Sequence, residues 1–577
     1  MNGAFGKILI IDLTGKKYRE ENVDEHIYHT YLGGKGLGTW LLLRYNPPGV
    51  NPLSPENIII FATGPITDAQ VFGSSRYGVF TKSPQTGIYL ESYAGGDVAE
   101  PLSRTGYDAI ILSGACSQPT YLEISNGTVR FHDATHLWGM ETYAAEDAIR
   151  QEMSIPQAGI AVIGPAGERL VRFAVIENNY WRSCGRGGAG AVLGSKKVKG
   201  VVFHGIQKKA LAHPELLTGL WKEMGAKAKT NPGAIAYKKY GTPMVVAMTN
   251  KIGAFPTQYW SRGTYEKWEN ISADALLAEC DVHPKSCPKC FIACGKLSQV
   301  KEGRHKGLRL EGPEYETINA FGGICMIGDI REIIYLNDIC DRLGMDTISA
   351  GNLAGFVIEG SHRKDLGFRL EYGDVDGIAN LLKKIAMKEG EGAVLAEGIL
   401  AAAKAWGLED LAIHAKGMEP PGYEPRVLKG MGLAYATSDR GACHLRSTFY
   451  KPELAGIIPP DQIEGKAAVF TEWEDRLTLQ DGLILCRFFR DLYLWDEFAT
   501  MIKGTLGLEL DKEGLRRIAG NILNLTREYN QREGVKLDDD VLPDRIHKEP
   551  LADSGKSLPR IELQEMVSQY HHLRGWK

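Results

Sequence analysis

Three cysteines within eight residues carry the most distinctive chemistry of this 577-residue chain: Cys287-Pro-Lys-Cys290-Phe-Ile-Ala-Cys294. Thiolates at this C-x2-C-x3-C spacing can bind three corners of one iron–sulfur cluster, and the fourth ligand can come from a distant part of the chain. Structural zinc is a weaker interpretation, because no second C-x2-C or His pair accompanies the cysteines. Buried free thiols are the other alternative. Spacing alone leaves Cys280 and Cys486 as candidates for the fourth ligand.

Two six-residue segments resemble each other: Asp341-Arg-Leu-Gly-Met-Asp346 and Asp481-Gly-Leu-Ile-Leu-Cys486. The first follows an amphipathic helix predicted over 329–343, and its Gly is suited to the position after a helix end. Asp341 would then lie in the last helical turn, where a carboxylate opposes the helix dipole. That unfavourable place indicates a ligand contact. The alternative is a pair of ordinary capped helix ends.

Two further groups of residues could bind an anion or transfer a proton. Gly185-Arg-Gly-Gly-Ala-Gly190 offers backbone N–H groups beside Arg182 and Arg186, a combination that suits phosphate oxygens. Glu316 and His444 would supply acid/base chemistry if the fold brings them into one pocket. A desolvated carboxyl group there should have a raised pKa. A single Glu or His is more often structural, so this interpretation depends on the pairing.

Composition excludes several classes of function. The net charge is −4 and the pI about 6.4, which gives no electrostatic footprint for nucleic acid or anionic membrane. Apolar runs are only as long as strands, so no membrane insertion is expected. The ten cysteines occur without a signal-peptide pattern, which favours free thiols or metal ligands over disulfides. We therefore expect a cytoplasmic protein.

The elements that must position these residues change in kind along the chain. Residues 1–208 are predicted to be β-rich, with hairpin turns at Thr14-Gly15 and Asn126-Gly127. Helical periodicity dominates from about Pro214, and one helix is predicted over 472–490. We divide the chain into an N-terminal β-rich domain that carries the Gly-rich loop, 1–208, and two helical domains, 209–418 and 419–577. The fold class is α+β.

Taken together, these residues resemble the tungsten-containing aldehyde ferredoxin oxidoreductases. Order and spacing agree from about residue 3 to the C-terminal Leu-Arg-Gly-Trp576. The segments that carry the resemblance, besides the three cysteines and the two Asp-led segments, are Gly73-Ser-Ser-Arg76-Tyr77, Thr81-Lys-Ser-Pro84, Gly106-Tyr-Asp108, Ile163-Gly-Pro-Ala-Gly-Glu168, Gly185-Arg-Gly-Gly188 and Glu311-Gly-Pro-Glu-Tyr-Glu316.

The resemblance implies an architecture and a reaction. A base domain of two sheets would support two mainly helical domains, with a tungsten ion held between them by the dithiolenes of two pyranopterins. Molybdenum is possible in its place, because the protein donates no ligand to this metal. A nearby [4Fe-4S] cluster would pass electrons to ferredoxin or to an iron–sulfur or flavin partner subunit. The implied substrate is an aldehyde, oxidised with water to a carboxylic acid.

Residue roles also come from the resemblance. The cluster ligands would be Cys287, Cys290, Cys294 and Cys486, and Glu316 and His444 would be the catalytic acid/base pair. Asp341 and Asp481 would each accept hydrogen bonds from one pterin. The remaining cofactor contacts would be Arg76, Gly95, Arg182, Gly185, Met345, Asp346, Arg446 and Leu485. A Mg²⁺ ion would take the backbone carbonyls of Tyr93 and Ser183.

Three departures from the family pattern stand out. Ile484 replaces the usual Gly of the second Asp-led segment, and Met345 replaces Leu in the first. Tyr335 and Asp338 replace the E-x-x-H pair that holds a metal between subunits in some members, so any homo-oligomer would form without that metal. Two other functions remain open: the tungsten subunit of a larger reductase, such as benzoyl-CoA reductase, and a non-catalytic iron–sulfur electron-transfer protein.

Overall fold

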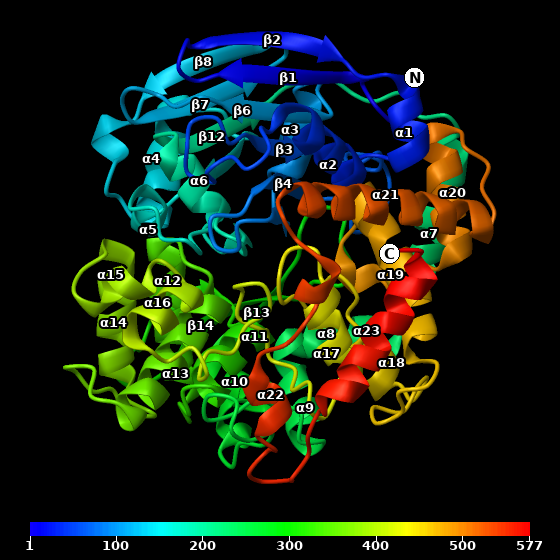
Figure 1. Cartoon of the computed structure of the whole chain (residues 1–577). Helices are drawn as coiled ribbons and strands as arrows, with labels where there is room; N and C mark the ends of the chain where they lie inside the picture. Colours follow the sequence, from blue (N-terminus) through cyan, green and yellow to red (C-terminus); the bar gives the residue numbers. More distant parts are fainter.

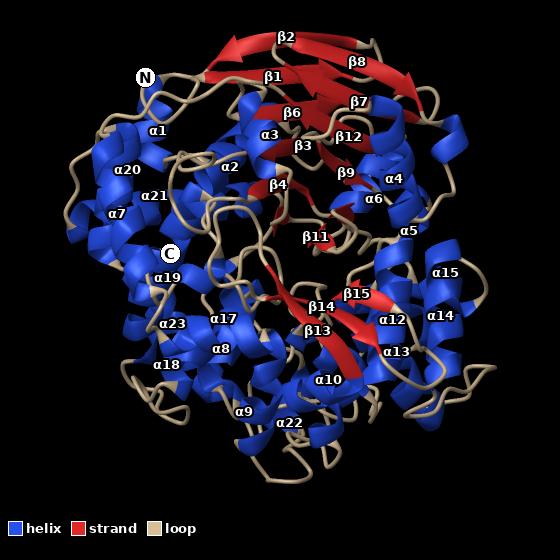
Figure 2. Cartoon of the chain, turned by 180° about the vertical axis from the view of Figure 1, so that it is seen from behind, coloured by secondary structure: helices blue, strands red, loops and turns tan.

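Two six-stranded mixed sheets form the N-terminal part of the computed structural model, which describes residues 1–577 (Figures 1 and 2). The first sheet has the order β2-β1-β6-β3-β4-β5 and the second β11-β10-β9-β12-β7-β8. The strands are β1 Lys7–Asp12, β2 Lys17–Asn22, β3 Ile59–Ala62, β4 Tyr77–Lys82, β5 Tyr89–Ala94, β6 Ala109–Ser113, β7 Thr120–Ser125, β8 Thr128–Asp133, β9 Gly159–Val162, β10 Ile176–Asn178, β11 Arg182–Cys184 and β12 Val198–His204.

The two sheets have the same topology. Each begins with an antiparallel hairpin, β1–β2 or β7–β8, whose first strand runs parallel to the last strand of its sheet, β6 or β12. In each sheet that last strand pairs antiparallel with a three-strand meander, β3–β4–β5 or β9–β10–β11. The base domain is therefore an internal duplication, which no short sequence repeat had indicated.

Both predicted hairpin turns form. Asn126 and Gly127, between β7 and β8, have φ values of 25° and 83°, the left-handed backbone that a tight two-residue hairpin requires. The inner faces of the two sheets pack against each other around one apolar core. Phe61 of β3 and Phe203 of β12 meet there, with ring centroids 5.6 Å apart. This burial fixes the position of one sheet relative to the other.

Helices make up most of the remaining chain. Six helices accompany the sheets: α1 Glu25–Tyr31, α2 Gly34–Tyr45, α3 Ala99–Arg104, α4 Thr142–Met153, α5 Pro165–Glu168 and α6 Ala189–Ser195. The others are α7 Pro214–Lys227, α8 Pro232–Tyr240, α9 Val245–Lys251, α10 Ala273–Glu279, α11 Tyr315–Ile318, α12 Ile330–Leu343, α13 Thr347–Arg363, α14 Val375–Met387, α15 Glu391–Leu395, α16 Ile399–Trp406, α17 Lys429–Thr437, α18 Tyr450–Leu454, α19 Lys466–Leu483, α20 Trp495–Leu506, α21 Lys512–Arg532, α22 Asp544–Lys548 and α23 Arg560–Arg574. No helix combines the length and the apolar character needed to cross a membrane.

A third, three-stranded sheet lies among the helices, in the order β13-β14-β15 (Figure 2). Its strands are β13 Cys280–Lys285, β14 Gly295–Val300 and β15 Arg309–Glu311. The three clustered cysteines occupy the connection between β13 and β14. This sheet therefore holds the cysteine segment by both of its ends.

The predicted helix over 472–490 was wrong at its C-terminal end. Helix α19 stops at Leu483, and only a short 3₁₀ turn follows at Arg487–Phe489. The reason is local: Ile484 has φ 52° and ψ 51°, and a left-handed residue cannot continue a right-handed helix. The predicted helix over 329–343 is confirmed as α12, with Asp329 as its N-cap.

The chain returns to the N-terminal domain near its end. Helix α19 contacts α2 and α21, and α21 lies along α2 on the side of the first sheet (Figure 1). Helix α12 instead contacts α4, which covers the second sheet. The two helices that carry the Asp-led segments thus approach different halves of the duplicated base domain.

Candidate functional site

The two Asp-led segments form the same helix ending. After α12, the N–H of Gly344 donates to Asp341 O at 3.2 Å and that of Met345 to Cys340 O at 2.9 Å. After α19, the N–H of Ile484 donates to Asp481 O at 3.2 Å and that of Leu485 to Gln480 O at 2.8 Å. These paired bonds define a Schellman ending in both places. The position five residues after each Asp is an N-cap, filled by Asp346 for α13 and by Cys486 for the 3₁₀ turn.

Each helix end is held against a Gly-Pro turn of the base domain. A Cβ atom on Gly164, which follows β9, would lie 2.5 Å from Leu343 O. A Cβ atom on Gly64, which follows β3, would lie 1.8 Å from Leu483 O. Only glycine allows an approach this close. The duplicated sheets therefore receive the two helix ends in matching ways.

Between these elements lies a cavity of about 350 Å³. Its walls come from β5, β11, α11, the ends of α12 and α19, and the loop over 440–450. Of the residues singled out from the sequence, the cavity is lined by Arg76, Tyr93, Ser183, Gly185, Glu316, Asp341, Met345, Asp346, His444, Arg446, Asp481, Leu485 and Cys486. The fold thus brings together groups that are up to about 410 positions apart in the chain (Arg76 to Cys486).

The two aspartates have different partners. Asp481 accepts from Arg446 at 2.7 Å and from Arg487 at 2.7 and 2.8 Å. Asp341 accepts only from the Asn337 side chain, at 2.8 Å. Burial, and next the charge of Asp338, raise the pKa of Asp341 well above its ordinary range. A ligand with N–H donors would supply the hydrogen bonds that Asp341 lacks, so the residue fits a pterin edge.

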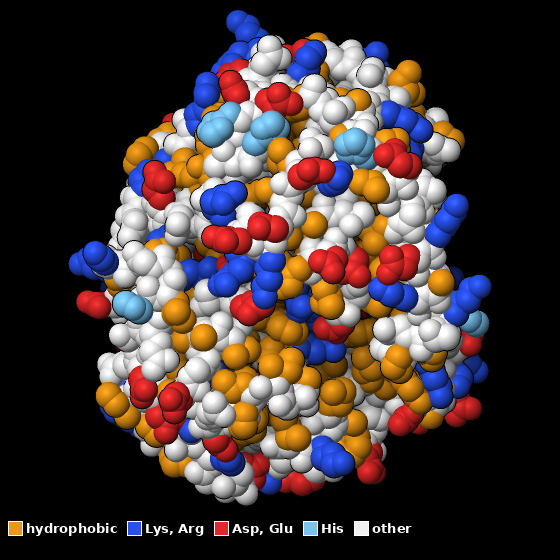
Figure 3. Space-filling view, turned by 90° about the vertical axis from the view of Figure 1, so that its right-hand side faces the viewer, with side chains coloured by type: hydrophobic (Ala, Val, Ile, Leu, Met, Phe, Trp, Pro, Cys, Tyr) orange, Lys and Arg blue, Asp and Glu red, His pale blue; other side chains and the backbone are white.

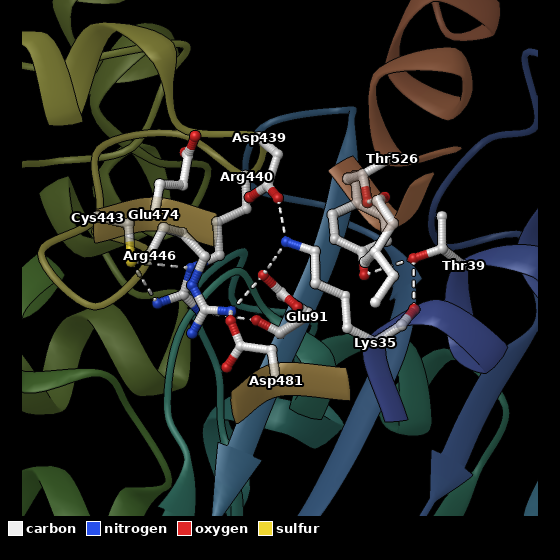
Figure 4. Close-up of polar contacts among 12 residues, drawn as sticks. Lys35, Thr39, Glu91, Asp439, Arg440, Cys443, Arg446, Glu474, Asp481 and Thr526 are labelled. Atoms are coloured by element: carbon white, nitrogen blue, oxygen red, sulfur yellow. Dashed lines mark hydrogen bonds and ion pairs between the residues drawn. The ribbon is translucent and has the colours of Figure 1, made fainter. Parts of the chain in front are cut away.

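A buried ion network supports the second aspartate (Figure 4). Glu91 on β5 accepts from Lys35 at 2.9 Å and also from Arg446, which links it to Asp481. Lys35 donates in addition to Asp439. Burial opposes ionisation of Glu91, but Arg446 and Lys35 outweigh it and lower the pKa to about 2. Glu91 therefore stays charged and fixes Arg446 against the cavity.

Glu316 and His444 face each other, with 3.6 Å between Glu316 Oε1 and His444 Nε2. Burial raises the pKa of Glu316 to about 8, although the Gly422 N–H and Arg186 act against it. Burial and the surrounding arginines, Arg186 first, lower the pKa of His444 well below its ordinary range. The pair is therefore neutral at pH 7 and is not an ion pair. Glu316 Oε1 and His444 Nδ1 have no hydrogen-bond partner, so both are free for a ligand.

Four cysteines surround a smaller cavity of about 30 Å³ beside the first. They are Cys287, Cys290, Cys294 and Cys486, and the other lining residues include Arg76 and Arg182. No three His, Cys, Asp or Glu side chains converge closely enough to hold a single metal ion. Thiols around a shared space fit a polynuclear cluster, which contributes its own iron and sulfide atoms. Cys280 lies instead in the apolar core, 1% exposed, and does not line this cavity.

The remaining predicted contacts lie at the wall between the two cavities. Gly95 has no room for a side chain, because a Cβ atom there would be 2.9 Å from Cys287 Sγ. Arg76 donates to the carbonyl of Tyr93 at 2.8 Å. Tyr93 and Ser183 lie on the edge strands β5 and β11, which are in contact. Nothing else in the structure marks a Mg²⁺ site there.

Asp346 has a role that the sequence did not indicate. Its carboxylate caps α13 by accepting from the backbone of Ile348 and Ser349, and Arg186 donates to it at 3.2 Å. Met345 and Leu485 occupy equivalent positions and are 2% and 4% exposed. Both supply apolar surface on either side of the cavity.

Sequence reasoning missed several charged residues around the cavity. Glu91, Lys35 and Arg487 have no spacing in the sequence that distinguishes them from surface charges. Arg490, also missed, lies four residues after Cys486. One signal was available. Glu91 lies in the middle of a strand that is otherwise mostly apolar, and a carboxylate buried in such a strand needs a cation as partner.

Comparison with known proteins gives matches over essentially the whole chain. The family described as "Aldehyde ferredoxin oxidoreductase, N-terminal domain" matches residues 8–205, and "Aldehyde ferredoxin oxidoreductase, domains 2 & 3" matches residues 219–577. The chain is 35% identical to the tungsten-containing aldehyde ferredoxin oxidoreductase of Pyrococcus furiosus, over 100% of this chain and 97% of that one.

Two further relatives have other functions. The WOR-like subunit of the aliphatic sulfonate oxidoreductase of the same organism is 31% identical over 99% of this chain and 94% of its own length. Among solved structures, the BamBC active-site complex of benzoyl coenzyme A reductase with 1,5-dienoyl-CoA matches with a TM-score of 0.85 and 25% identity, over 100% of this chain and 95% of that one.

Proposed function

Because this chain belongs to the aldehyde ferredoxin oxidoreductase family, we propose that it oxidises an aldehyde to the corresponding carboxylic acid. One observation carries the proposal: the neutral Glu316–His444 pair opens into the same cavity as both Asp-led helix ends. The cavity with four cysteines lies directly beside it and shares Arg76 and Cys486 as lining residues. Chemistry at the first cavity thus has an adjacent route for electrons.

In this proposal the cavity holds a tungsten bis(pyranopterin) group. Asp341 and Asp481 each accept hydrogen bonds from one pterin, and Met345, Asp346 and Leu485 flank the rings. Arg76, Gly95, Arg182, Gly185 and Arg446 are the other contacts, and a Mg²⁺ ion takes the carbonyls of Tyr93 and Ser183. Cys287, Cys290, Cys294 and Cys486 bind a [4Fe-4S] cluster. When bound, these groups supply two-electron oxidation and one-electron transfer to an acceptor.

Two residues of the chain carry out the proton transfer and hydrogen bonding of the reaction. Aldehyde and water become carboxylic acid with the release of two electrons and two protons. The N–H of the neutral His444 donates a hydrogen bond to the aldehyde oxygen, which makes the carbonyl carbon more electrophilic. Glu316 in its ionised form takes a proton from the attacking water through Oε1, which has no other partner. The apolar burial of both side chains keeps bulk water away from this exchange.

The acceptor in this proposal is ferredoxin or an iron–sulfur partner subunit. A second candidate is the catalytic subunit of a larger reductase, such as a benzoyl-CoA reductase, which runs electrons in the opposite direction. The match to the BamBC complex over the whole chain is what favours it. Activity on an aryl-CoA thioester without activity on aldehydes, together with co-purifying subunits, would identify that alternative.

Anaerobic purification and metal analysis test the proposal, followed by an aldehyde panel with a viologen dye as acceptor. We expect about four iron atoms and one tungsten atom per chain, and aldehyde-dependent dye reduction. Iron without tungsten or molybdenum would contradict an enzyme and favour a non-catalytic electron-transfer protein. Metal-replete protein that reduces no dye with any aldehyde would contradict the reaction.

A further inference from the structure

Arg490 differs from most of the arginines around the main cavity. Arg76 also forms no ion pair, but it is only half-buried and lies beside the four cysteines. Arg182, Arg186, Arg446 and Arg487 each pair with a carboxylate, of Glu311, Asp346 or Asp481. Arg440 has no carboxylate partner, but its guanidinium donates to Cys443 Sγ and to the carbonyl of Glu91. Arg490 forms no ion pair, and its neighbour Asp491 pairs with Lys451 instead, at 3.3 Å.

The guanidinium of Arg490 is nevertheless buried, with 2% of the residue exposed. Nη1 donates to Arg487 O at 3.0 Å and Nη2 to the hydroxyl of Tyr450 at 3.4 Å. Nε has no hydrogen-bond partner. A buried cation without an anion is costly, and proteins normally pair it. Because Arg490 lines the cavity, its missing anion can come from a bound ligand.

Aromatic rings connect this cation to the catalytic pair. The guanidinium lies 6.0 Å from the ring centroid of Tyr450, and Tyr450 stacks on Tyr423 at 4.1 Å. The Tyr423 ring is in turn 5.9 Å from that of His444. Arg490 is close enough for its charge to contribute to the lowered pKa of His444. One wall of the cavity thus runs from the acid/base pair, along flat apolar surface, to an unpaired cation.

The cavity also has a further aromatic pair near this cation. Tyr237 of α8 and Phe488 both line it, with ring centroids 4.8 Å apart. On the face of the molecule that carries α7, α18 and α20, Figure 3 shows hydrophobic side chains around a hollow with Lys or Arg side chains inside it. Aromatic rings beside a buried cation suit a ligand with an apolar body and an anionic end.

We propose that Arg490 binds an oxyanion group of the substrate, so that the substrate is an aldehyde with a carboxylate or sulfonate at its far end. The inference rests on the proposed function, because it assumes that the aldehyde group lies at Glu316 and His444. The planar fork of arginine suits either oxyanion, and Nε with one Nη supplies the two parallel donors. The Tyr450–Tyr423 wall would support an aromatic or extended apolar spacer.

Paired substrates test this on the holoenzyme. We compare kcat/KM for 4-formylbenzoate and 4-formylbenzenesulfonate with that for the neutral isostere 4-formylbenzamide. The wild type should prefer at least one anion by about tenfold or more, and R490M should lose about 10- to 100-fold on that anion, mainly through KM, with little change on the amide. R490K should recover part of the loss. The better of the two anions identifies the group.

The control variant is R476M. Arg476 on α19 also lacks a partner for Nε and lies over an aromatic ring, Trp473, at 4.3 Å, but it does not line the cavity. It should leave the substrate preference unchanged. Equal losses on anion and amide in R490M, no loss on the anion, or reduced tungsten content in R490M would each overturn the inference, the last in favour of a cofactor contact.

A binding measurement separates this inference from the proposed function. Terephthalate should bind the wild-type holoenzyme more tightly than 4-carbamoylbenzamide by calorimetry, and R490M should abolish the difference. If no aldehyde is oxidised but this difference is found, the proposed reaction fails and the anion site stands. If aldehydes are oxidised and the difference is absent, the anion site fails and the reaction stands.

Discussion

Gly344 and Ile484 have the same left-handed backbone at the ends of two helices, with φ, ψ values of 78°, 53° and 52°, 51°. Each follows a helix whose last turn presents an aspartate to the cavity. A β-branched residue in this conformation is strained by roughly 1 kcal/mol or more. Ile484 is only 1% exposed, and its packing offsets that strain. Ile484 therefore gives the second helix the same ending that Gly344 gives the first.

The first helix end gives a prediction about both stability and cofactor binding. Gly344→Ala should lower the free energy of unfolding by about 1–2 kcal/mol through backbone strain, and a Cβ there would press on Gly164 N at 3.0 Å. Displacement of the helix end should also lower tungsten content. Thermal unfolding and metal analysis measure the two effects.

Gly407→Ala is the matched control for that change. Gly407 ends α16 with φ 62° and ψ 49°, and its Cβ would meet only the flexible end of Lys364, at 3.2 Å. It should lose similar stability without losing tungsten. Unchanged tungsten content in Gly344→Ala would contradict the role given to this helix end.

The pH dependence should follow Glu316. If its ionised form takes the proton, kcat/KM rises about tenfold per pH unit below its pKa of about 8 and levels off above it. Glu316→Gln should remove nearly all activity at every pH while retaining the metals. A stopped-flow or steady-state pH series with a viologen acceptor measures this profile.

Glu453→Gln controls for the loss of a buried carboxyl group. Burial raises the pKa of Glu453 to about 7, but the residue pairs with Lys466 and lies outside the cavity. This variant should keep the wild-type pH profile even if it is less stable. A wild-type rate that falls as the pH rises towards 8 would show that the protonated form of Glu316 is the active one.

The fourth cluster ligand can be decided by paired cysteine variants. Cys486→Ser should lower the iron content and alter the electron paramagnetic resonance spectrum of the reduced protein, because Cys486 lines the four-cysteine cavity. Cys280→Ser, in the apolar core, should cost some stability and leave the spectrum unchanged. The reverse pattern of spectra would assign the ligand to Cys280.

Glu91, which contacts the cavity residue Arg446, should make the stability of the protein depend on pH in the acid range. Its pKa is lowered from 4.5 to about 2, so its charge contributes about 3 kcal/mol above pH 4.5, and this contribution is lost as the pH falls from there to 2. Glu91→Gln leaves Lys35 and Arg446 without their buried carboxylate and should destabilise the protein by about 3–5 kcal/mol at pH 7.

The comparison between Glu91→Gln and the wild type should therefore depend on pH. Denaturant unfolding of the two proteins should differ most near pH 7, and the difference should shrink below pH 4. Glu371→Gln serves as the control, because that carboxylate is exposed at the surface and pairs with Arg369. A difference that stays constant from pH 7 to pH 3 would contradict the ionised Glu91.

Local patterns were sufficient for much of the fold. The β-rich start, both hairpin turns and α12 depend on residues that are near neighbours in the chain, so the sequence predicted them. The predicted C-terminal end of α19 was wrong because it depends on contacts with residues that are distant in the chain. Nothing local in Asp481–Cys486 terminates a helix, because Ile484 takes its left-handed backbone from contacts with a distant segment, where Gly34 leaves room for its side chain.

By itself, the sequence determined the chemical groups: three clustered thiols, two Asp-led segments and a pattern that resembles one family from end to end. The tertiary structure decided which of them meet. It placed Cys486 rather than Cys280 beside the other cysteines and left Arg490 buried without an anion. It also arranged two sheets of the same topology so that each receives one helix end. These outcomes depend on packing between segments hundreds of residues apart. Burial keeps Glu316 neutral, and Arg446 and Lys35 keep Glu91 charged, only once those segments are in contact.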